Sequence, residues 1–259
     1  MSFETEWRQW KAEREEALVE PHGWLALVSL DWLGREPRAH DGVPGLWWQD
    51  DEAAYLDPQG AELEHDGVAL TGVTRFELVN SGAGTRVLSG DVEIEVARRS
   101  GYLIRVHDPK AEALRAFHGV PSYDPAESWV VEARYEPFDE PVPTTVGAVV
   151  EGLTHVYQAP GRVRFTRDGR EHALTAFNGT EGGLSILFTD ETSGVTTYGA
   201  NRSLKTTAPD PDGRVLLDFN RAVNLPCAFT PYATCPLPPE GNRLPFPVEA
   251  GEKTPHEAV

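Results

Sequence analysis

The stretch Arg162-Val-Arg-Phe-Thr-Arg-Asp-Gly-Arg-Glu-His-Ala-Leu-Thr-Ala-Phe177 decides the fold class of this protein. It contains two short runs, Arg162 to Thr166 and His172 to Phe177, that are rich in apolar and aromatic residues. The turn signal Asp168-Gly169 lies between the two runs. Two such runs joined by Asp-Gly are typical of antiparallel strands.

The same alternation of apolar runs and turn residues extends in both directions, from about residue 43 to residue 219. Short runs of valine, leucine, isoleucine and aromatic residues alternate with turn residues, for example at 57–60, 181–183 and 210–213. This spacing is typical of an antiparallel barrel or sandwich. We therefore predict a mainly β fold, with a single β-rich domain over residues 35–252 and one short helix around residues 109–117.

The N-terminus has a different pattern. Residues 3–20 place apolar side chains at helical spacing, and Pro21 and Gly23 follow as a stop signal. The apolar run over 23–33 fits either a buried strand or a short core helix. We predict that residues 1–34 form a helical arm packed on the main domain, and that residues 253–259 form a frayed tail.

The composition excludes several classes of partner. The chain has 259 residues, with 41 acidic and 23 basic side chains and a net charge of −18. This charge argues against nucleic acid as the main partner and against a polybasic membrane contact, because both need a basic face. No apolar run reaches the roughly 18 residues of a membrane-spanning helix.

Lysine is rare, since only 4 of the 23 basic residues are lysines. Many carboxylates with few lysines favour a protein of a halophile, whose surface stays hydrated at high salt; a mesophile with a GC-rich genome is the alternative. The charged first twenty residues contain no apolar segment like that of a signal peptide, so a cytoplasmic location is expected.

The C-terminal segment from Leu217 to Leu244 is unusual. Eight of the 21 prolines lie at or after Pro226, so the loop is stiff and can present its side chains in one geometry. Residues 198–259 hold 6 basic and 7 acidic side chains, which makes this part nearly neutral. An anionic ligand would be tolerated best here.

This segment also carries a resemblance. The chain resembles the bacterial and archaeal family DUF1684, which has no established activity. The similarity rests on these stretches: Phe188 to Tyr198, Tyr198 to Leu204, Asp218-Phe-Asn-Arg-Ala-Val-Asn-Leu-Pro-Cys-Ala-Phe229, Cys235-Pro-Leu-Pro-Pro239, Asn242-Arg-Leu244, Ala250-Gly-Glu252, and upstream Gly23-Trp-Leu25 and Phe117 to Tyr123. The chain departs from the family pattern at Leu225, where a second proline is usual, and at Val223, where an aromatic residue is common.

Three arginines in this region, Arg202, Arg221 and Arg243, each follow an asparagine that could orient the guanidinium group. Guanidinium groups bind carboxylate or phosphate through paired hydrogen bonds. We predict a pocket for a small polar or anionic ligand, bordered by the C-terminal loop, to which His118 and Tyr123 could contribute. Its predicted ligand-binding residues are Tyr198, Arg202, Asn220, Arg221, Asn224, Asn242 and Arg243. In the alternative interpretation, Arg221 pairs with Asp218 or Glu252 and only pins the loop; in either case we expect these residues to be mostly buried.

The sequence identifies neither a reaction nor a cofactor. If the protein is an enzyme, Asp218, Glu252 and His118 are the candidate acids or bases. Cys227 and Cys235 are eight residues apart, which is not the spacing of a zinc knuckle; they are weak metal candidates and otherwise buried thiols. A non-catalytic ligand-binding module and a purely structural β module stay open as alternatives.

Overall fold

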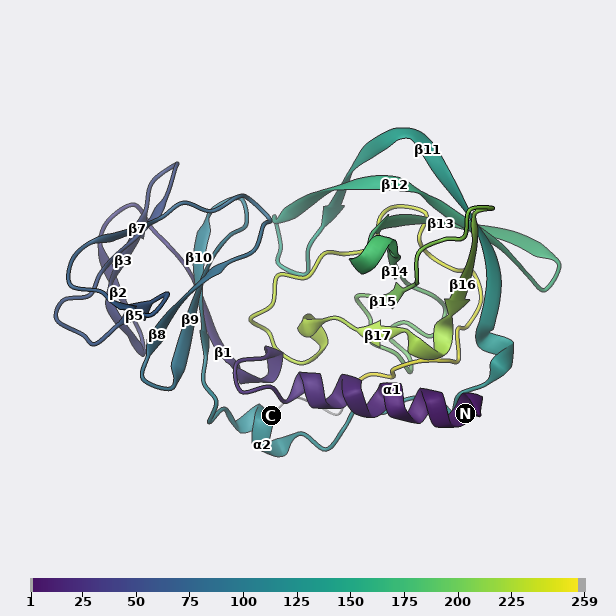
Figure 1. The fold of residues 1–259 in the computed structure, drawn as a ribbon, viewed down its shortest axis with the longest axis horizontal. Helices are drawn as coiled ribbons and strands as arrows, with labels where there is room; N and C mark the ends of the chain where they lie inside the picture. Colours follow the sequence, from purple (N-terminus) through teal and green to yellow (C-terminus); the bar gives the residue numbers. More distant parts are fainter. Residues whose placement is uncertain (1, 256–259) are drawn as a thin grey trace. The chain divides into compact units, whose positions relative to one another are not determined.

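The computed structural model describes residues 2–255 and divides the chain into two compact units. We call residues 2–15, 119–229 and 234–255 the C-terminal unit, and residues 16–118 with 230–233 the N-terminal unit. All strand pairs between named strands are antiparallel. Figure 1 labels most of the α-helices and strands of the two units.

The N-terminal unit contains two sheets that enclose one core. The first has the strand order β1 (Leu27–Trp32), β10 (Tyr102–His107), β9 (Val92–Arg98), β8 (Thr85–Ser89), β5 (Glu64–His65) and β6 (Val68–Ala69). The second has the order β2 (Arg38–His40), β3 (Val43–Gln49), β4 (Ala54–Asp57) and β7 (Thr74–Phe76). Trp47 of the second sheet and Ile94 and Ile104 of the first belong to the same buried cluster. The unit is therefore a sandwich, to which the short helices η1 (Trp24–Ala26) and α2 (Glu112–Ala116) are added.

The C-terminal unit is built on one seven-stranded sheet. Its order is β16 (Arg214–Asp218), β11 (Val130–Gly147), β12 (Thr154–Arg167), β13 (Arg170–Asn178), β14 (Leu184–Phe188), β15 (Arg202–Lys205) and β17 (Val223–Asn224). Four short 3-10 helices interrupt the connections: η2 (Glu127–Trp129), η3 (Thr180–Gly182), η4 (Phe219–Arg221) and η5 (Pro226–Ala228). One face of the sheet carries the core, which includes Phe165, Phe188 and Phe219.

Strands β12 and β13 form the hairpin predicted from residues 162–177. Phe165 lies opposite His172, and the turn between the strands has positive φ at both Asp168 (51°) and Gly169 (72°). Two such residues are what a tight two-residue hairpin turn requires. Val163 and Phe165 are buried, whereas Arg162, Arg164 and Thr166 alternate with them on the other face. The alternation orients the whole sheet, because its period of two matches a strand with one buried face.

Helix α1 (Phe3–Leu18) confirms the predicted N-terminal helix, and its residues up to 15 belong to the C-terminal unit. Trp7 is buried and donates from its indole Nε1 to the carbonyl oxygen of Asn220 at 3.0 Å. Residues 27–32, which the sequence assigned to the helical arm, form β1 and pair with β10.

The mainly β prediction is confirmed, including the short helix around residues 109–117, which is α2. No ladder joins the two edge strands of any sheet in the described part of the chain, so the sandwich and not the barrel is the better description. A single β-rich domain over 35–252 stays a prediction. Lys253 and Thr254 are held by backbone hydrogen bonds, and the remainder of the predicted tail, 256–259, lies outside the described residues. Among residues 2–255, no helix is long and apolar enough to cross a membrane.

Candidate functional site

Arg202, predicted to bind an anion, is buried and fully surrounded by groups of its own chain. Its side chain is 1% exposed. Nη2 donates to Oδ2 of Asp190 at 2.9 Å and to the carbonyl of Val248 at 3.0 Å, and Nη1 donates to the carbonyls of Ala250 and Glu252. The guanidinium thus connects β15 to the C-terminal segment 248–252. We call Arg202 and Asp190 the buried ion pair.

Asp190 is equally enclosed. Its Oδ1 accepts hydrogen bonds from the backbone N–H of Thr192 (2.7 Å), the hydroxyl of Thr192 (2.6 Å) and the N–H of Val248 (3.1 Å). Gly251 lets segment 248–252 pass close to the backbone of Ala222, because its φ is +78° and a Cβ there would lie 2.5 Å from the carbonyl oxygen of Ala222. This explains why glycine stands in the Ala250-Gly-Glu252 motif.

Glu252 docks helix α1. Its Oε1 is 3.1 Å from Nε of Arg14, and its Oε2 accepts the backbone N–H of Asn224 at 2.6 Å. Arg14 also donates to the carbonyl of Asn224, and Asn224 donates from its side chain to the carbonyl of Lys253 at 2.8 Å. Both carboxylate oxygens of Glu252 therefore have partners in the chain, and the side chain is 4% exposed.

Asp218, Asn220 and Arg221 form a local turn. Asn220 is buried and exchanges two hydrogen bonds with the backbone of Ala126, while Asp218 accepts from its N–H at 3.1 Å and from its side-chain amide at 2.9 Å. Arg221 pairs with Asp218 at 3.1 Å, as the alternative interpretation predicted. Arg221 is partly buried, and its side chain is 40% exposed beside the ring of Trp10. The expectation that the predicted residues are mostly buried is wrong for Arg243, which is exposed.

Asn242 and Arg243 are neighbours in the sequence but differ in burial. Asn242 is 2% exposed and accepts the N–H of Thr175 (2.8 Å) while donating to the carbonyls of Thr175 (2.9 Å) and Leu187 (2.8 Å). Arg243 is exposed, and its backbone bridges to Thr189. Within residues 2–255, no hydrogen bond or ion pair joins any two of the three predicted arginines.

Of the remaining predicted residues, Tyr123 joins segment 248–252, since its backbone N–H donates to the carbonyl of Gly251 at 3.0 Å. Tyr198 donates from its hydroxyl to the carbonyl of Cys227 at 2.8 Å. Tyr123 shares a hydrogen bond with the hydroxyl of Thr196, and His118 is exposed in the N-terminal unit. Cys227 and Cys235 are both reduced. In the described part of the chain, no group of three or more histidine, cysteine or acidic side chains is placed to hold a metal ion.

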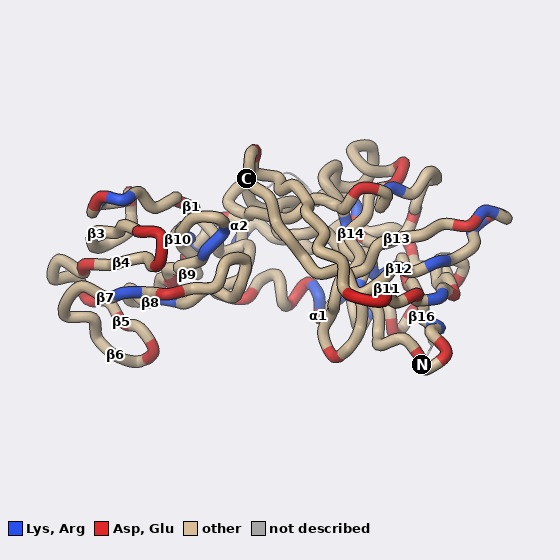
Figure 2. The backbone as a smooth tube through the Cα atoms, turned by 90° about the horizontal axis from the view of Figure 1, so that it is seen from above, with Lys and Arg blue, Asp and Glu red and all other residues tan. Residues whose placement is uncertain are grey.

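A row of three arginines, which sequence reasoning missed, crosses the solvent-facing side of the seven-stranded sheet. Arg164 of β12 lies opposite Arg134 of β11, and Arg134 lies opposite Arg214 of β16. Directly opposed residues point to the same face of a sheet, and neighbouring strands are about 4.7–4.9 Å apart. We call these residues the arginine row. In Figure 2 the basic segments near β11, β12 and β16 lie among acidic ones.

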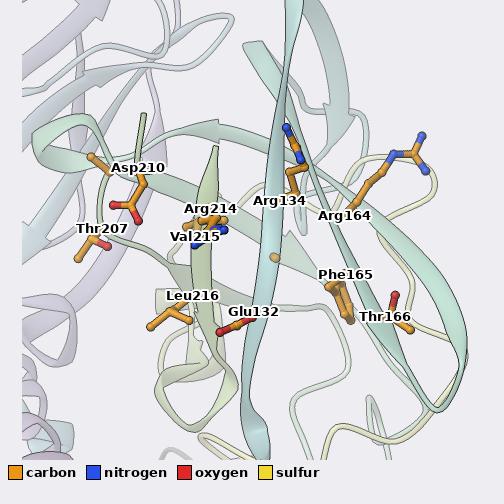
Figure 3. A pocket seen from close by; sticks show the side chains of 12 residues that line it. Glu132, Arg134, Arg164, Phe165, Thr166, Thr207, Asp210, Arg214, Val215 and Leu216 are labelled. Atoms are coloured by element: carbon orange, nitrogen blue, oxygen red, sulfur yellow. The ribbon is translucent and has the colours of Figure 1, made fainter. Parts of the chain in front are cut away.

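The arginine row borders a cavity of about 690 Å³, the arginine groove, which is shown in Figure 3. Its volume falls within the range of small-molecule sites. The groove is lined by Glu132, Ala133, Arg134, Arg164, Phe165, Thr166, Thr207, Ala208, Asp210, Arg214, Val215 and Leu216. None of the residues predicted from the C-terminal motif lines it.

The three arginines differ in their partners. Arg164 is held by Glu136 (2.7 Å) and Glu171 (2.6 Å), and Figure 3 shows its side chain pointing away from the other two. Hydrogen bonds from Arg164 and Arg162 lower the pKa of Glu136. Arg134 and Arg214 have no ion pair within residues 2–255. Like charges that face each other across strands destabilise a sheet, so an anion between them would relieve repulsion.

A separate buried charge cluster lies in the N-terminal unit. Arg105, whose side chain is 3% exposed, binds Oε2 of Glu95 through Nε at 2.8 Å, and Nε2 of His107 lies 3.6 Å from the same oxygen. Burial acts to raise the pKa of Glu95, but the hydrogen bond from His107 and the charge and hydrogen bond of Arg105 outweigh it and hold this pKa below its ordinary value.

The lowered pKa of Glu95 predicts that the contribution of this carboxylate to the free energy of unfolding is lost at acid pH. The ionised carboxylate stabilises the folded state above its unfolded pKa, near 4.5, and the stabilisation is lost as the pH falls through the lower folded pKa. The difference in unfolding free energy between the parent and Glu95→Gln should therefore be largest at neutral pH and shrink below about pH 4.5. Urea unfolding from pH 3 to 7, with the exposed Glu64→Gln as control, measures it. Parallel curves for parent and Glu95→Gln would contradict this assignment.

Comparison with known proteins identifies the family. The sequence model of the family described as "Protein of unknown function (DUF1684)" matches residues 115–253, which is more than half of the chain. The chain belongs to the DUF1684 family. The match confirms the resemblance seen in the C-terminal motif. In this DUF1684 chain, the matched region includes the arginine row as well as the buried ion pair.

One solved structure is similar to part of the chain. It is the solution NMR structure of an uncharacterized protein of Haloarcula marismortui, 32% identical, with a TM-score of 0.46; the similarity covers 55% of this chain and 80% of that one. No curated protein matches the chain.

Proposed function

We propose that this DUF1684 chain binds a small phosphate-bearing molecule in the arginine groove. The observation that carries the proposal is the pair Arg134 and Arg214, which lie directly opposite each other on neighbouring strands without a carboxylate partner among the described residues. In a protein of net charge −18, such a local concentration of unpaired positive charge needs a reason.

The chemistry of the lining indicates the class of ligand. A phosphate monoester carries nearly two negative charges near pH 7 and several strong acceptor oxygens, and adjacent guanidinium groups can each donate two hydrogen bonds to it. Leu216, which is 55% exposed, provides apolar surface for the organic part of the molecule, and the hydroxyls of Thr166 and Thr207 provide further hydrogen-bonding groups. The carboxylates of Glu132 and Asp210 would accept hydrogen bonds from sugar-like hydroxyls and disfavour a bare polyanion.

A binding role is favoured over a catalytic one. The lining contains no histidine, cysteine, lysine or serine that could act as nucleophile or proton carrier near neutral pH. The candidate acids or bases of the C-terminal motif, Asp218, Glu252 and His118, do not line the groove. The hydrogen bonds that both Nη atoms of Arg202 and the side-chain amide of Asn242 make within the chain support a structural role for that motif, which then holds the sheet that carries the arginine row.

Removing the two unpaired arginines should weaken binding. Isothermal titration with 3-phosphoglycerate at low ionic strength is expected to show binding to the parent, and inorganic pyrophosphate, a bare polyanion, should bind more weakly because of Glu132 and Asp210. Arg134→Gln and Arg214→Gln should each weaken it by about tenfold or more, because a charge-assisted hydrogen bond contributes about 1.5–3 kcal/mol and 1.4 kcal/mol is tenfold in affinity. Affinity should also fall steeply with added salt.

The matched control is Arg170→Gln. Arg170 lies on β13 of the same sheet and is exposed, but it does not line the groove. This variant changes the net charge by the same amount, so it should bind like the parent. If neither probe binds the parent, or if Arg170→Gln loses as much affinity as the two groove variants, the proposal is wrong.

A further inference from the structure

The two cysteines, which the proposed ligand site does not use, lie on neighbouring segments of the C-terminal unit. Cys227 lies in η5, and Cys235 follows eight residues later, directly before the run Pro236-Leu-Pro-Pro239. The backbone N–H of Cys227 donates to Sγ of Cys235 at 3.2 Å. The side chains of the two cysteines also form a hydrogen bond, so both the backbone and the thiol of Cys227 contact the sulfur of Cys235.

Both cysteines are held in place by hydrogen bonds on either side. On the Cys227 side, the hydroxyl of Tyr198 donates to the carbonyl of Cys227 at 2.8 Å. On the Cys235 side, the N–H of Val149 donates to the carbonyl of Cys235 at 3.0 Å, and the side chain of Asn201 donates to the carbonyl of Pro236 at 2.7 Å. The proximity of the two thiols is therefore built into the fold and does not depend on the motion of a free loop.

The surroundings favour Cys227 as the reacting thiol. Hydrogen bonding to Cys235 lowers the pKa of Cys227, against the effect of burial, and Tyr198 lowers it further. Burial, together with the neighbouring cysteines, raises the pKa of Tyr198 to about 12, so its hydroxyl keeps its proton and stays a donor. Cys227 is also the more accessible of the two, since Cys235 is buried. A partly exposed thiol with a lowered pKa is the kind that oxidants attack first.

We propose that Cys227 and Cys235 are a redox modification site that a hydroperoxide converts into an intramolecular disulfide. The thiolate of Cys227 attacks one peroxide oxygen, the O–O bond breaks, and Cys227 becomes a sulfenic acid as hydroxide leaves and is protonated to water. The thiolate of Cys235 then attacks the sulfur of Cys227, the S–O bond breaks and a second water leaves. For hydrogen peroxide, two thiols are oxidised to one disulfide and the peroxide is reduced to two waters.

The product closes a ring over residues 227–235. This ring contains the last two residues of η5, Cys227 and Ala228, and the chain that follows up to Cys235, so oxidation would restrict this part of the loop in the unfolded chain. Neither cysteine lines the arginine groove, so this inference does not depend on whether the groove binds the proposed ligand.

Alkylation and mass spectrometry test the proposal on the full chain. Reduced protein is treated with hydrogen peroxide, denatured in the presence of iodoacetamide, and weighed. We expect the loss of both alkylation labels, no dimer on a non-reducing gel, a peptide map that links Cys227 to Cys235, and recovery of both labels after dithiothreitol. Cys235→Ser should instead accumulate a sulfenic acid at Cys227, which dimedone traps.

Two outcomes would overturn the proposal: full retention of both labels in the parent after peroxide, or disulfides found only between molecules. Circular dichroism of each sample shows whether the fold is kept during the reaction. The result does not require the serine variant to fold, because the parent alone distinguishes the outcomes.

Discussion

Replacing Asp190 by alanine is expected to lower the free energy of unfolding by about 3–5 kcal/mol, the cost of leaving one member of a buried ion pair without its partner. The side chains of Arg202 and Asp190 are 1% and 0% exposed, so water cannot replace the carboxylate. The change also leaves the hydroxyl and N–H of Thr192 and the N–H of Val248 without their acceptor. This is the largest effect that we predict for a single substitution in this chain.

Urea unfolding, followed by far-ultraviolet circular dichroism, measures the effect as a lower midpoint. The control is Glu171→Ala. Glu171 lies on β13 of the seven-stranded sheet and its side chain is 65% exposed, so the loss of its carboxylate should change the midpoint little. The double variant Asp190→Leu with Arg202→Met should recover part of the loss, because replacing both charges by apolar groups removes the stranded charge. A midpoint for Asp190→Ala equal to that of the parent would show that the ion pair does not hold segment 248–252.

Asn242→Ala is expected to cost about 2–4 kcal/mol, because buried donors and acceptors left unpaired cost about 1–3 kcal/mol each. The Asn242 side chain serves the N–H and carbonyl of Thr175 on β13 and the carbonyl of Leu187 on β14. It therefore bridges two strands near the place where their ladder contains only the pairs Phe177–Ser185 and Asn178–Leu184. Alanine would leave all three backbone groups facing an apolar methyl group.

The exposed Asn178→Ala, on β13 itself, is the matched control and should have little effect on the unfolding free energy. Hydrogen exchange gives a second measurement, because the amide of Thr175 should lose protection in Asn242→Ala but not in Asn178→Ala. If Asn242→Ala unfolds like its control, the amide is not a necessary bridge between β13 and β14.

Local features of the fold were predictable from the sequence. Helix α1 has apolar side chains at helical spacing and a proline-glycine stop, and the β12–β13 hairpin has alternating side chains on either side of Asp168-Gly169. Both patterns act within a few residues, where steric preference and the choice of buried face operate without help from the rest of the chain. The same holds for the recognition of the C-terminal motif, which depends on residues close together in the sequence.

In the C-terminal motif, the burial of the polar residues was predictable from the sequence, whereas their hydrogen-bond partners were not. Asn220, Asn224 and Asn242 were predicted to bind a ligand and to be mostly buried, and all three are buried and hydrogen-bonded within the chain. Their partners were not predictable. Glu252 binds Arg14 across 238 positions of the sequence, and Arg202 pairs with Asp190, which was not among the predicted site residues. A guanidinium can pair with any carboxylate, so composition and spacing cannot select one.

The sequence by itself determined the mainly antiparallel β character, the N-terminal helix and the family, because these follow from periodicity, turn residues and contiguous motifs. Only the tertiary structure decided which charges are buried and which are left unpaired. Arg134, Arg164 and Arg214 come from strands separated by 30 and 50 positions in the chain, and they form a row only because the register aligns them. A shift of one residue in that register would send alternate side chains to the other face, so the row exists through long-range pairing that no local pattern encodes.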